Sequence, residues 1–364
     1  MPNPELPLVP YEQDQHEAGL MALLAKYHGQ AKQESRKRVV DWIQERMPGC
    51  EQTPLRHVIV DGGRIAGTMG HLPAEFLIGG VRVPARFTHD LLVDPDYRGH
   101  GLAKRLVSHA LQTGEFFPGG MWMTGPCYQI HLACGFTDMP PLASLTLALD
   151  PDVFLNRKKL SILKRAAAKV ALGANRSKAL KQARAFGRNA VWTIRTVEAF
   201  DPALDATWVK LLGTYGIGRL REAAFLNWKY ASHPNLSYRL LLAERFGSVA
   251  GYLIWRLAPD GAEEKRAAVT DFLVPRGAVE PLSALLSRVI LDAAVTDTEA
   301  ISVLTTQPWA AELLRKFGFF PKGEKDGWVT ANWESILPPD RFLAPDQWHV
   351  CMGDSDGDIW TGSQ

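Results

Sequence analysis

The chain of 364 residues contains the same pattern twice, and this internal repeat restricts its fold more than any other feature. Four short motifs of the first half return in the same order in the second half, 181 to 186 residues later. Solenoid repeats have periods of only about 20 to 50 residues, so this repeat has the length of a complete domain. The matching pairs are Trp42 and Trp228, Ala66-Gly67 and Ala250-Gly251, Asp90 and Asp271, and Gly135-Phe136 and Gly318-Phe319.

Each copy shows the same order of expected elements. N-terminal helices are followed by antiparallel strands, a buried strand, a helix, a strand, a second helix and a final strand. This order predicts an α/β fold, an α+β mixed sheet with helices on its faces. We expect an N-terminal domain at residues 1–150, a basic helical linker at 151–194, and a second domain with a C-terminal tail at 195–364.

A strand, a glycine turn and a helix follow one another directly in the first copy. The turn contains Arg98, Gly99 and Gly101, and apolar residues recur at helical spacing from Leu102 onward. The first amides of a helix have no partner within the helix, and the helix dipole favours negative charge there. Glycines let the backbone approach phosphate oxygens, and arginine adds a charge-assisted hydrogen bond. The pattern predicts a pyrophosphate site; a purely structural turn is the alternative.

The motif around this turn resembles the acyl-CoA-binding motif of the GNAT acyltransferase superfamily. Its defined positions are filled by Val93, Pro95, Arg98, Gly101 and Ala103. A dinucleotide-binding fingerprint fits less well, because Lys104 stands where that motif requires a third glycine. The resemblance covers roughly residues 10–150 and 195–335 and implies two tandem GNAT-like domains with acetyl-CoA as cosubstrate. The residues it implies for CoA binding are Leu91, Leu92, Val93, Arg98, Gly99, His100, Gly101, Leu102 and Ala103.

The second copy departs from the motif at the turn. Aligned on the prolines, Ala278 replaces the arginine, and Pro281 replaces a glycine and removes a backbone donor. Glu280 brings a negative charge to the place where phosphate would bind. We therefore expect this copy not to bind CoA in the usual way.

A later helix resembles the second GNAT signature, in which a tyrosine often protonates the leaving thiolate. His131 stands at that position in the first copy, and Leu314, which has no proton to donate, stands there in the second. His131 is thus the first candidate for the catalytic acid, with substrate contact or a buried hydrogen-bonded role as alternatives. Tyr128, one helical turn away, is the reserve donor.

The base that would accept the proton of the amine is sought on the strand before the turn, which offers His89 and Asp90. Asp90 recurs as Asp271 in the degenerate copy, which favours a structural role, whereas His89 becomes Thr270 there. His71 and Glu75 are weaker candidates. The oxyanion would be stabilised by backbone amides near Leu92 and Val93.

Charge is distributed unevenly. Residues 153–197 contain twelve Lys and Arg and no Asp or Glu, which leaves 29 basic against 39 acidic residues elsewhere. A linker packed on the acidic body is the favoured interpretation of this segment, ahead of a membrane surface and of nucleic acid. Four cysteines without a Cys-x-x-Cys pair and the lack of a signal peptide favour a cytoplasmic location.

No metal site is expected from the spacing of His, Cys and Asp. The C-terminal run from Gly353 to Trp360 lacks the glycine and glutamate positions of a calcium loop, so a surface turn or a tail that reaches into a cleft remains.

The leading hypothesis is an acyltransferase that transfers an acetyl or short acyl group from acyl-CoA to a small-molecule amine. A faint resemblance of Trp228–Tyr230 and the C-terminal tail to GNAT proteins found with bacterial polysaccharide genes slightly favours an amino sugar as acceptor. Aminoglycoside-like amines, polyamines, peptide N-termini and lipid-linked sugars are the alternative acceptors. The alternatives are a CoA-responsive binding protein without turnover and a Fem-type aminoacyltransferase. Nucleic acid is not an expected partner, and the oligomeric state is left open.

Overall fold

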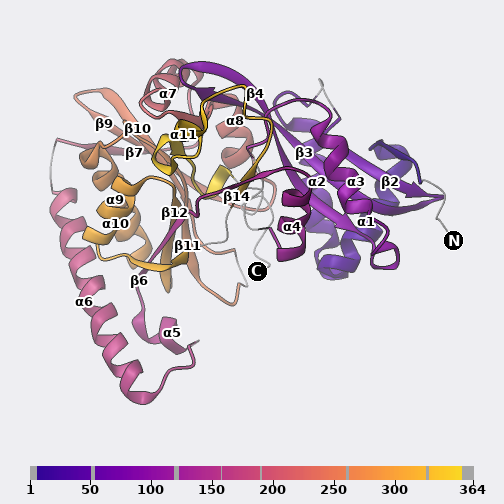
Figure 1. The fold of residues 1–364 in the computed structure, drawn as a ribbon. Helices are drawn as coiled ribbons and strands as arrows, with labels where there is room; N and C mark the ends of the chain where they lie inside the picture. The colour runs from indigo at the N-terminus through magenta and orange to yellow at the C-terminus, as the bar shows by residue number, and fades with distance from the viewer. Residues whose placement is uncertain are drawn as a thin grey trace. The chain divides into compact units, whose positions relative to one another are not determined.

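The computed structural model describes residues 6–50, 54–118, 123–156, 158–188, 191–259, 262–324 and 328–354. These residues form two compact units (Figure 1). Unit 1 is drawn from Met1–Pro140, His233–Asn235 and Asp326–Leu343; unit 2 is drawn from Pro141–Ser232, Leu236–Lys325 and Ala344–Gln364. No helix among the described residues is both long enough and apolar enough to cross a membrane.

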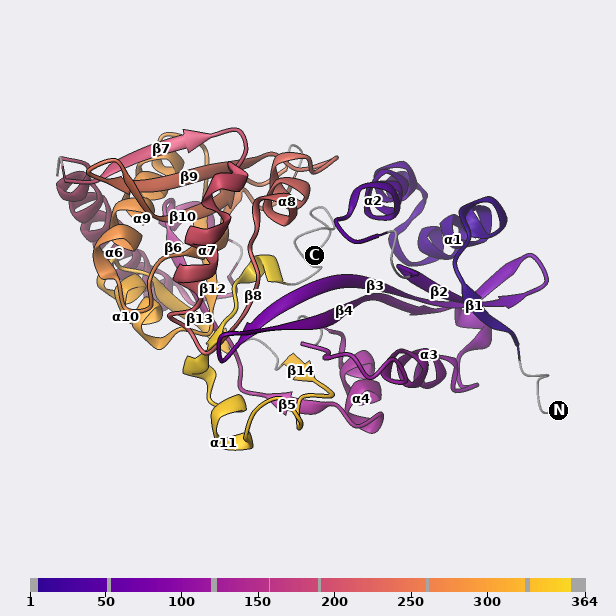
Figure 2. The same cartoon turned by 90° about the horizontal axis from the view of Figure 1, so that it is seen from above.

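Unit 1 is built on an antiparallel sheet with strand order β1-β2-β3-β4. Helices α1 and α2 lie on one face of this sheet, and α3 and α4 lie on the other (Figure 2). The apolar side of α3, with Leu106 and Val107, packs against Ile59 and Met69 of the sheet. The elements are β1 (Leu8–Pro10), α1 (Gln13–His28), α2 (Gln33–Arg46), β2 (Arg56–Asp61), β3 (Arg64–Ile78), β4 (Val81–Val93), α3 (Leu102–Leu111), α4 (Gly125–Ala133), β5 (Thr137–Met139), β14 (Trp328–Thr330) and α11 (Pro339–Phe342).

Unit 2 is built on a mixed sheet with strand order β13-β6-β12-β11-β10-β9-β7. Helix α9 buries Leu285 and Val289 against Leu253 and Trp255 of this sheet. The elements are β6 (Ala143–Ala148), α5 (Pro151–Asn156), α6 (Ile162–Gly187), β7 (Thr193–Val197), α7 (Asp205–Leu212), β8 (Ile217–Arg219), α8 (Ala223–Leu226), β9 (Tyr238–Arg245), β10 (Ser248–Arg256), β11 (Arg266–Leu273), α9 (Val279–Ala294), β12 (Ala300–Thr305), α10 (Pro308–Lys316), β13 (Phe320–Glu324) and β15 (Trp348–His349). Sheets covered by helices agree with the α/β class that the sequence predicted, and the sheet of unit 2 is the mixed type.

Each unit contains a strand from the other half of the sequence. β6 is the last strand of the expected N-terminal domain, yet it lies between β12 and β13 of unit 2 and is antiparallel to both. Conversely, β14 comes from the end of the second copy and pairs with β5, while Ala331 bridges to Phe117 in unit 1. The sequence did not predict this exchange, because the pattern of a strand defines its faces and not the edge with which it pairs.

Two irregularities recur at matching places of the two copies. Ala66 is an extra residue where β3 pairs with β2, and Ala250 is the extra residue where β10 pairs with β9. β4 contains an extra residue next to Asp90 in its pairing with β3, and β11 has an extra residue, Thr270, next to Asp271. Because bulges are specific local features of a sheet, their recurrence supports the duplication inferred from the sequence.

The exchanged strand gives a direct prediction. Leu147 of β6 is fully buried in the core of unit 2, so Leu147→Ala should lower the free energy of unfolding by about 2–5 kcal/mol. Leu163→Ala, at a side chain that is 83% exposed, is the matched control and should cost less than about 0.5 kcal/mol. Urea denaturation measures both values. In this variant, amide hydrogen exchange should become faster in β12 and β13. Faster exchange confined to β2–β4 would contradict the placement of β6 in unit 2.

Candidate functional site

The turn after β4 has the geometry that an anion site needs. Gly99 and Gly101 have φ values of 83° and 73°, a left-handed region in which other residues are strained, and Gly101 is the N-cap residue of α3. Apart from the adjoining backbone, no described atom lies within 4 Å of the position that a Cβ would take at either glycine. The first amides of α3 therefore lie beneath an open stretch of backbone, at the positive end of the helix dipole.

Asp94 anchors this turn to the sheet. Its side chain accepts a hydrogen bond of 3.1 Å from the amide of Asp96 and pairs with Lys26 at 2.7 Å and Arg64 at 3.2 Å. Burial acts to raise the pKa of Asp94, but these hydrogen bonds outweigh burial and lower the pKa. Asp94 is thus ionised at neutral pH and fixes the start of the turn.

Arg98 is held by a residue of α1 that the sequence analysis missed. Its guanidinium donates to the hydroxyl of Tyr27 at 3.0 Å, and that hydroxyl donates to the carbonyl oxygen of Val93 at 2.5 Å. The amide of Asp94 donates to Ala66 of β3, so the amide and carbonyl of Val93 point away from β3. By the same alternation, the backbone amide and carbonyl of Leu92, which pairs with Thr68, point toward β3. No spacing rule connects Tyr27 with the turn.

The bulge of β4 places a buried carboxylate in the sheet. Asp90 adopts a φ of 46° and pairs with Arg56 at 3.1 Å and with Arg36 at 3.8 Å. Burial acts to raise the pKa of Asp90, but His89 and the arginines lower it overall. A carboxylate held in this way is a poor proton acceptor, and its geometry suits a structural role.

His89 lies beside this carboxylate, with its Nδ1 3.5 Å from an oxygen of Asp90. The imidazole is buried against the backbone of Gly70, where a Cβ would lie only 2.2 Å from its Nε2. Burial lowers the pKa of His89, so the ring is neutral at pH 7. The structure therefore brings His89 and Asp90 together at the bulge that precedes the turn.

His131 is buried on α4, and its ring packs edge-on against Phe136 with 4.9 Å between the ring centroids. Its Nδ1 donates to the carbonyl oxygen of Cys127 at 2.8 Å, while Nε2 has no hydrogen-bond partner among the described residues. Burial lowers the pKa of His131, which makes the neutral form dominant. In that form Nε2 holds a lone pair and cannot donate a proton. Tyr128, one turn earlier, is half-buried.

The weaker candidates lie elsewhere in unit 1. Glu75 is exposed and forms a surface ion pair of 3.3 Å with Arg82. His71 is buried and packs edge-on against His57, 5.2 Å away, and His57 in turn packs against His109. Burial lowers the pKa of His57 to about 4. His57 and His71 are therefore neutral at pH 7, and the three rings pack edge-on one after another in unit 1.

The degenerate copy fills the equivalent region with its own chain. β11 and β12 pair in parallel only as far as Val269 and Val303. Beyond this point the segment 348–351, which we call the C-terminal insert, bonds to both strands. Its Val350 carbonyl accepts from the amide of Thr306 at 3.2 Å, and His349 donates to the carbonyl of Phe272 at 2.7 Å. The remaining acidic residues of the tail, Asp356 and Asp358, lie outside the described residues.

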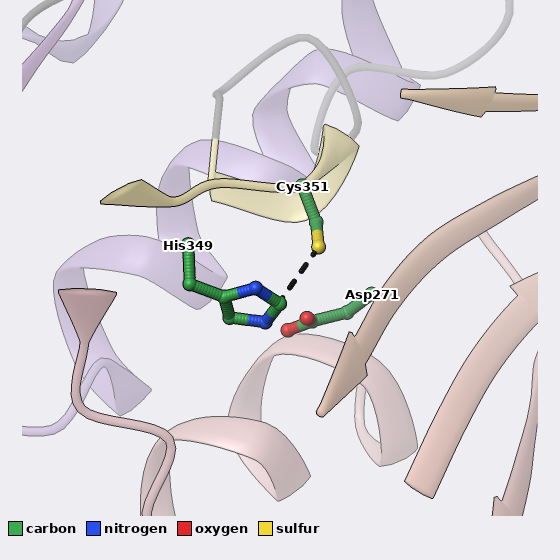
Figure 3. A group of neighbouring side chains, drawn as sticks. All are labelled: Asp271, His349 and Cys351. Atoms are coloured by element: carbon green, nitrogen blue, oxygen red, sulfur yellow. Dashed lines mark hydrogen bonds between the residues drawn. The ribbon is translucent and has the colours of Figure 1, made fainter. Parts of the chain in front are cut away.

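The C-terminal insert meets Asp271 in the interior of unit 2 (Figure 3). Among the described residues, Asp271, His349 and Cys351 have donor atoms close enough, within 4.8 Å, to hold a metal ion. However, both oxygens of Asp271 accept from Arg221 at 3.1 Å. Burial raises the pKa of Cys351, and burial followed by Arg221 lowers that of His349 to about 3. With Asp271 paired to Arg221 and His349 bonded to the carbonyl of Phe272, these side chains form a hydrogen-bonded core in this structure.

Unit 2 also contains a cavity of about 570 Å³. It is lined by Thr214, Arg276, Gly277, Gln307, Pro308, Trp309 and Asp346. Arg276 and Asp346 form an ion pair of 2.6 Å across it, so the one arginine of the degenerate turn is already neutralised by a neighbour.

Comparison with known proteins finds one matching family model and several solved structures with a similar fold. Residues 14–115 match the family model of the acetyltransferase (GNAT) domain. The fold is similar to that of a GCN5-related N-acetyltransferase from Anabaena variabilis, with a TM-score of 0.61 and 14% identity over 89% of this chain and 72% of that one. A second such protein, from Kribbella flavida, has a TM-score of 0.57 and 15% identity over 89% and 71%.

A third similar structure is the N-myristoyltransferase of Saccharomyces cerevisiae with bound myristoyl-CoA, with a TM-score of 0.56 and 10% identity over 91% of this chain and 83% of that one. No curated protein matches the sequence. The family match and the shared fold support the predicted relation to the GNAT superfamily and confirm the predicted α/β fold class. Residues 14–115 are thus similar to an acetyltransferase (GNAT) domain.

Proposed function

We propose that unit 1 transfers an acetyl or short acyl group from acyl-CoA to the amine of a small molecule. The observation that supports this most strongly is the open left-handed turn at Gly99 and Gly101, directly before α3. Backbone amides, a helix N-terminus and the guanidinium of Arg98 suit a pyrophosphate, which needs several donors and positive charge. Acyl-CoA supplies the thioester carbon that the amine attacks.

The backbone of β4 is suited to stabilise the charge that develops on the thioester oxygen. The Val93 amide points away from β3, and Tyr27 binds the Val93 carbonyl, so this peptide is fixed before substrate arrives. A preorganised amide donor is worth about 3–4 kcal/mol of barrier in acyl transfer. Of the predicted oxyanion residues, Val93 is therefore preferred over Leu92, whose amide is directed to β3.

We assign proton transfer to Tyr128 and His89. A phenolic hydroxyl is protonated at neutral pH and can donate to the departing thiolate, whereas neutral His131 presents only a lone pair at Nε2. His131 then acts as a positioning residue that ties the α4 backbone to the core through Cys127 and Phe136. The neutral imidazole of His89 is the better acceptor for the amine proton, because His89 and the arginines lower the pKa of Asp90 and so weaken it as a base.

A second candidate function is CoA-dependent regulation without turnover. The buried, neutral state of His131 at the usual tyrosine position favours it. The two functions share the CoA turn and differ in the proton donor, so binding and turnover must be measured separately. For the acceptor, we propose an amine-bearing small molecule, with amino sugars as the first class to test.

Binding of the coenzyme depends on Arg98. Arg98→Glu places a negative charge beside the pyrophosphate and should weaken acetyl-CoA binding at least tenfold in isothermal titration calorimetry. Arg82→Glu makes the same change of charge on the same unit, at the exposed tip of the β3–β4 hairpin, and should leave the affinity within about twofold. Equal affinities for the two variants would contradict the assigned site.

Turnover depends on Tyr128. Thiol release from acetyl-CoA with a panel of amino sugars and polyamines should fall about hundredfold in kcat for Tyr128→Phe, since a general acid contributes at least that factor. His131→Gln keeps a donor for the Cys127 carbonyl and should lose less than about fivefold. Acetyl-CoA affinity is the control for both variants. The opposite ranking would make His131 the acid, and wild-type binding without turnover for any amine would favour the regulatory function.

A further inference from the structure

The first half of α6 exposes apolar side chains on the side of the helix that faces away from α9. α6 packs on α9 through Ala179 and Ala183, and its Leu172 packs against Phe154 and Leu155 of α5. At 3.6 residues per turn, Leu163 and Val170 lie on the opposite side of the helix. Their side chains are 83% and 74% exposed, which is unusual for large apolar residues outside an interface.

Lysines surround this apolar surface. Ile162, 87% exposed, extends it to the first residue of α6, and Lys158, Lys159 and Lys164 are exposed beside it. Residues 153–197 contain no acidic residue, so none of these charges is neutralised by a neighbour within the segment. Lys169, by contrast, pairs with Asp152 at 2.7 Å. We call Ile162, Leu163, Lys164 and Val170, together with Lys158 and Lys159, the α6 patch.

We propose that the α6 patch binds the surface of an anionic phospholipid bilayer. Exposed aliphatic side chains enter the boundary between headgroups and acyl chains, while lysines remain at the level of the lipid phosphates. Both components lie in the first half of α6 and in Lys158 and Lys159 just before it. The rest of the sequence is acidic, with 29 basic against 39 acidic residues, so repulsion orients the basic segment toward the lipid.

Two other partners fit the α6 patch less well. Single-stranded nucleic acid binds to exposed aromatic rings on which bases stack, whereas Phe154 is buried and Phe186 is half-buried. A second copy of the chain would bring two clusters of lysines together, which costs energy without opposite charges to meet them. The sequence favoured a linker packed on the body. α6 packs along one of its sides, and the α6 patch lies on the other side.

The test is cosedimentation of the full chain with vesicles. Vesicles of phosphatidylcholine with 30% phosphatidylglycerol, a proportion of roughly one anionic lipid in three, should bind at least tenfold more tightly than pure phosphatidylcholine, and salt should weaken this binding. Equal binding to both vesicles, or no binding to the anionic ones, would overturn the proposal.

Matched variants separate the two components. Lys159→Gln with Lys164→Gln should weaken binding by about fivefold per lysine, since each charge near an acidic leaflet contributes about a factor of five. Lys210→Gln with Arg315→Gln, which removes two exposed charges elsewhere on unit 2, should change binding less than twofold. Leu163→Ser with Val170→Ser should weaken binding at least fivefold, whereas Val295→Ser, at a side chain that is 86% exposed on α9's C-terminal side, should not.

Other outcomes count against the proposal. If the Leu163→Ser/Val170→Ser variant binds vesicles like the wild type but abolishes a concentration-dependent dimer in lipid-free solution, the patch is an interface between copies. If a single-stranded homopolymer RNA binds more tightly than anionic vesicles at 150 mM salt, a salt level of about the physiological ionic strength, nucleic acid is the partner. Acetyl-CoA affinity should be the same in all these variants, which separates this proposal from the proposed transferase function.

Discussion

The structure depends on what the backbone N–H and C=O groups of a central strand bond to where that strand separates from its neighbour. A buried backbone donor or acceptor without a partner costs free energy, so such a place must be filled by chain, by side chains or by a ligand. In unit 2, the C-terminal insert occupies the place where β11 and β12 separate, and its Val350 and His349 bond to these two strands. In unit 1, β4 bonds to Phe116 next to Ala85, and beyond that bridge no described strand pairs with this edge. Tyr27 meets the carbonyl of Val93, and the turn that follows stays open.

The same duplicated fold can thus hold one site for a ligand and one site closed by its own chain. Pro281 and Glu280 remove the donor and the favourable charge from the second turn, and the ion pair of Arg276 with Asp346 neutralises its arginine. The buried network of Arg221, Asp271 and Asp354 then ties the C-terminal insert to the core.

Local chemistry could be predicted from the sequence, and long-range pairing could not. The glycine turn, the start of α3 and the relation to the GNAT superfamily follow from residues that lie within about a dozen positions of one another. The exchanged strands β6 and β14 join residues that are far apart in the sequence, and a strand pattern does not specify its partner. Tyr27 was missed for the same reason, since it reaches Arg98 from a helix 71 residues earlier. The state of His131 depends on burial and on Cys127, neither of which its motif position reveals.

The central claim is that the chain has one open CoA turn and one closed counterpart. The most direct test is the stoichiometry of acetyl-CoA bound to the full chain, measured by native mass spectrometry, for the wild type and for Gly101→Pro. Proline fixes φ near −65°, which is incompatible with the φ of 73° at this position, so the turn cannot keep its geometry. The account predicts a single bound molecule per wild-type chain and none for the variant. Two bound molecules, or a single one that survives the substitution, would contradict it.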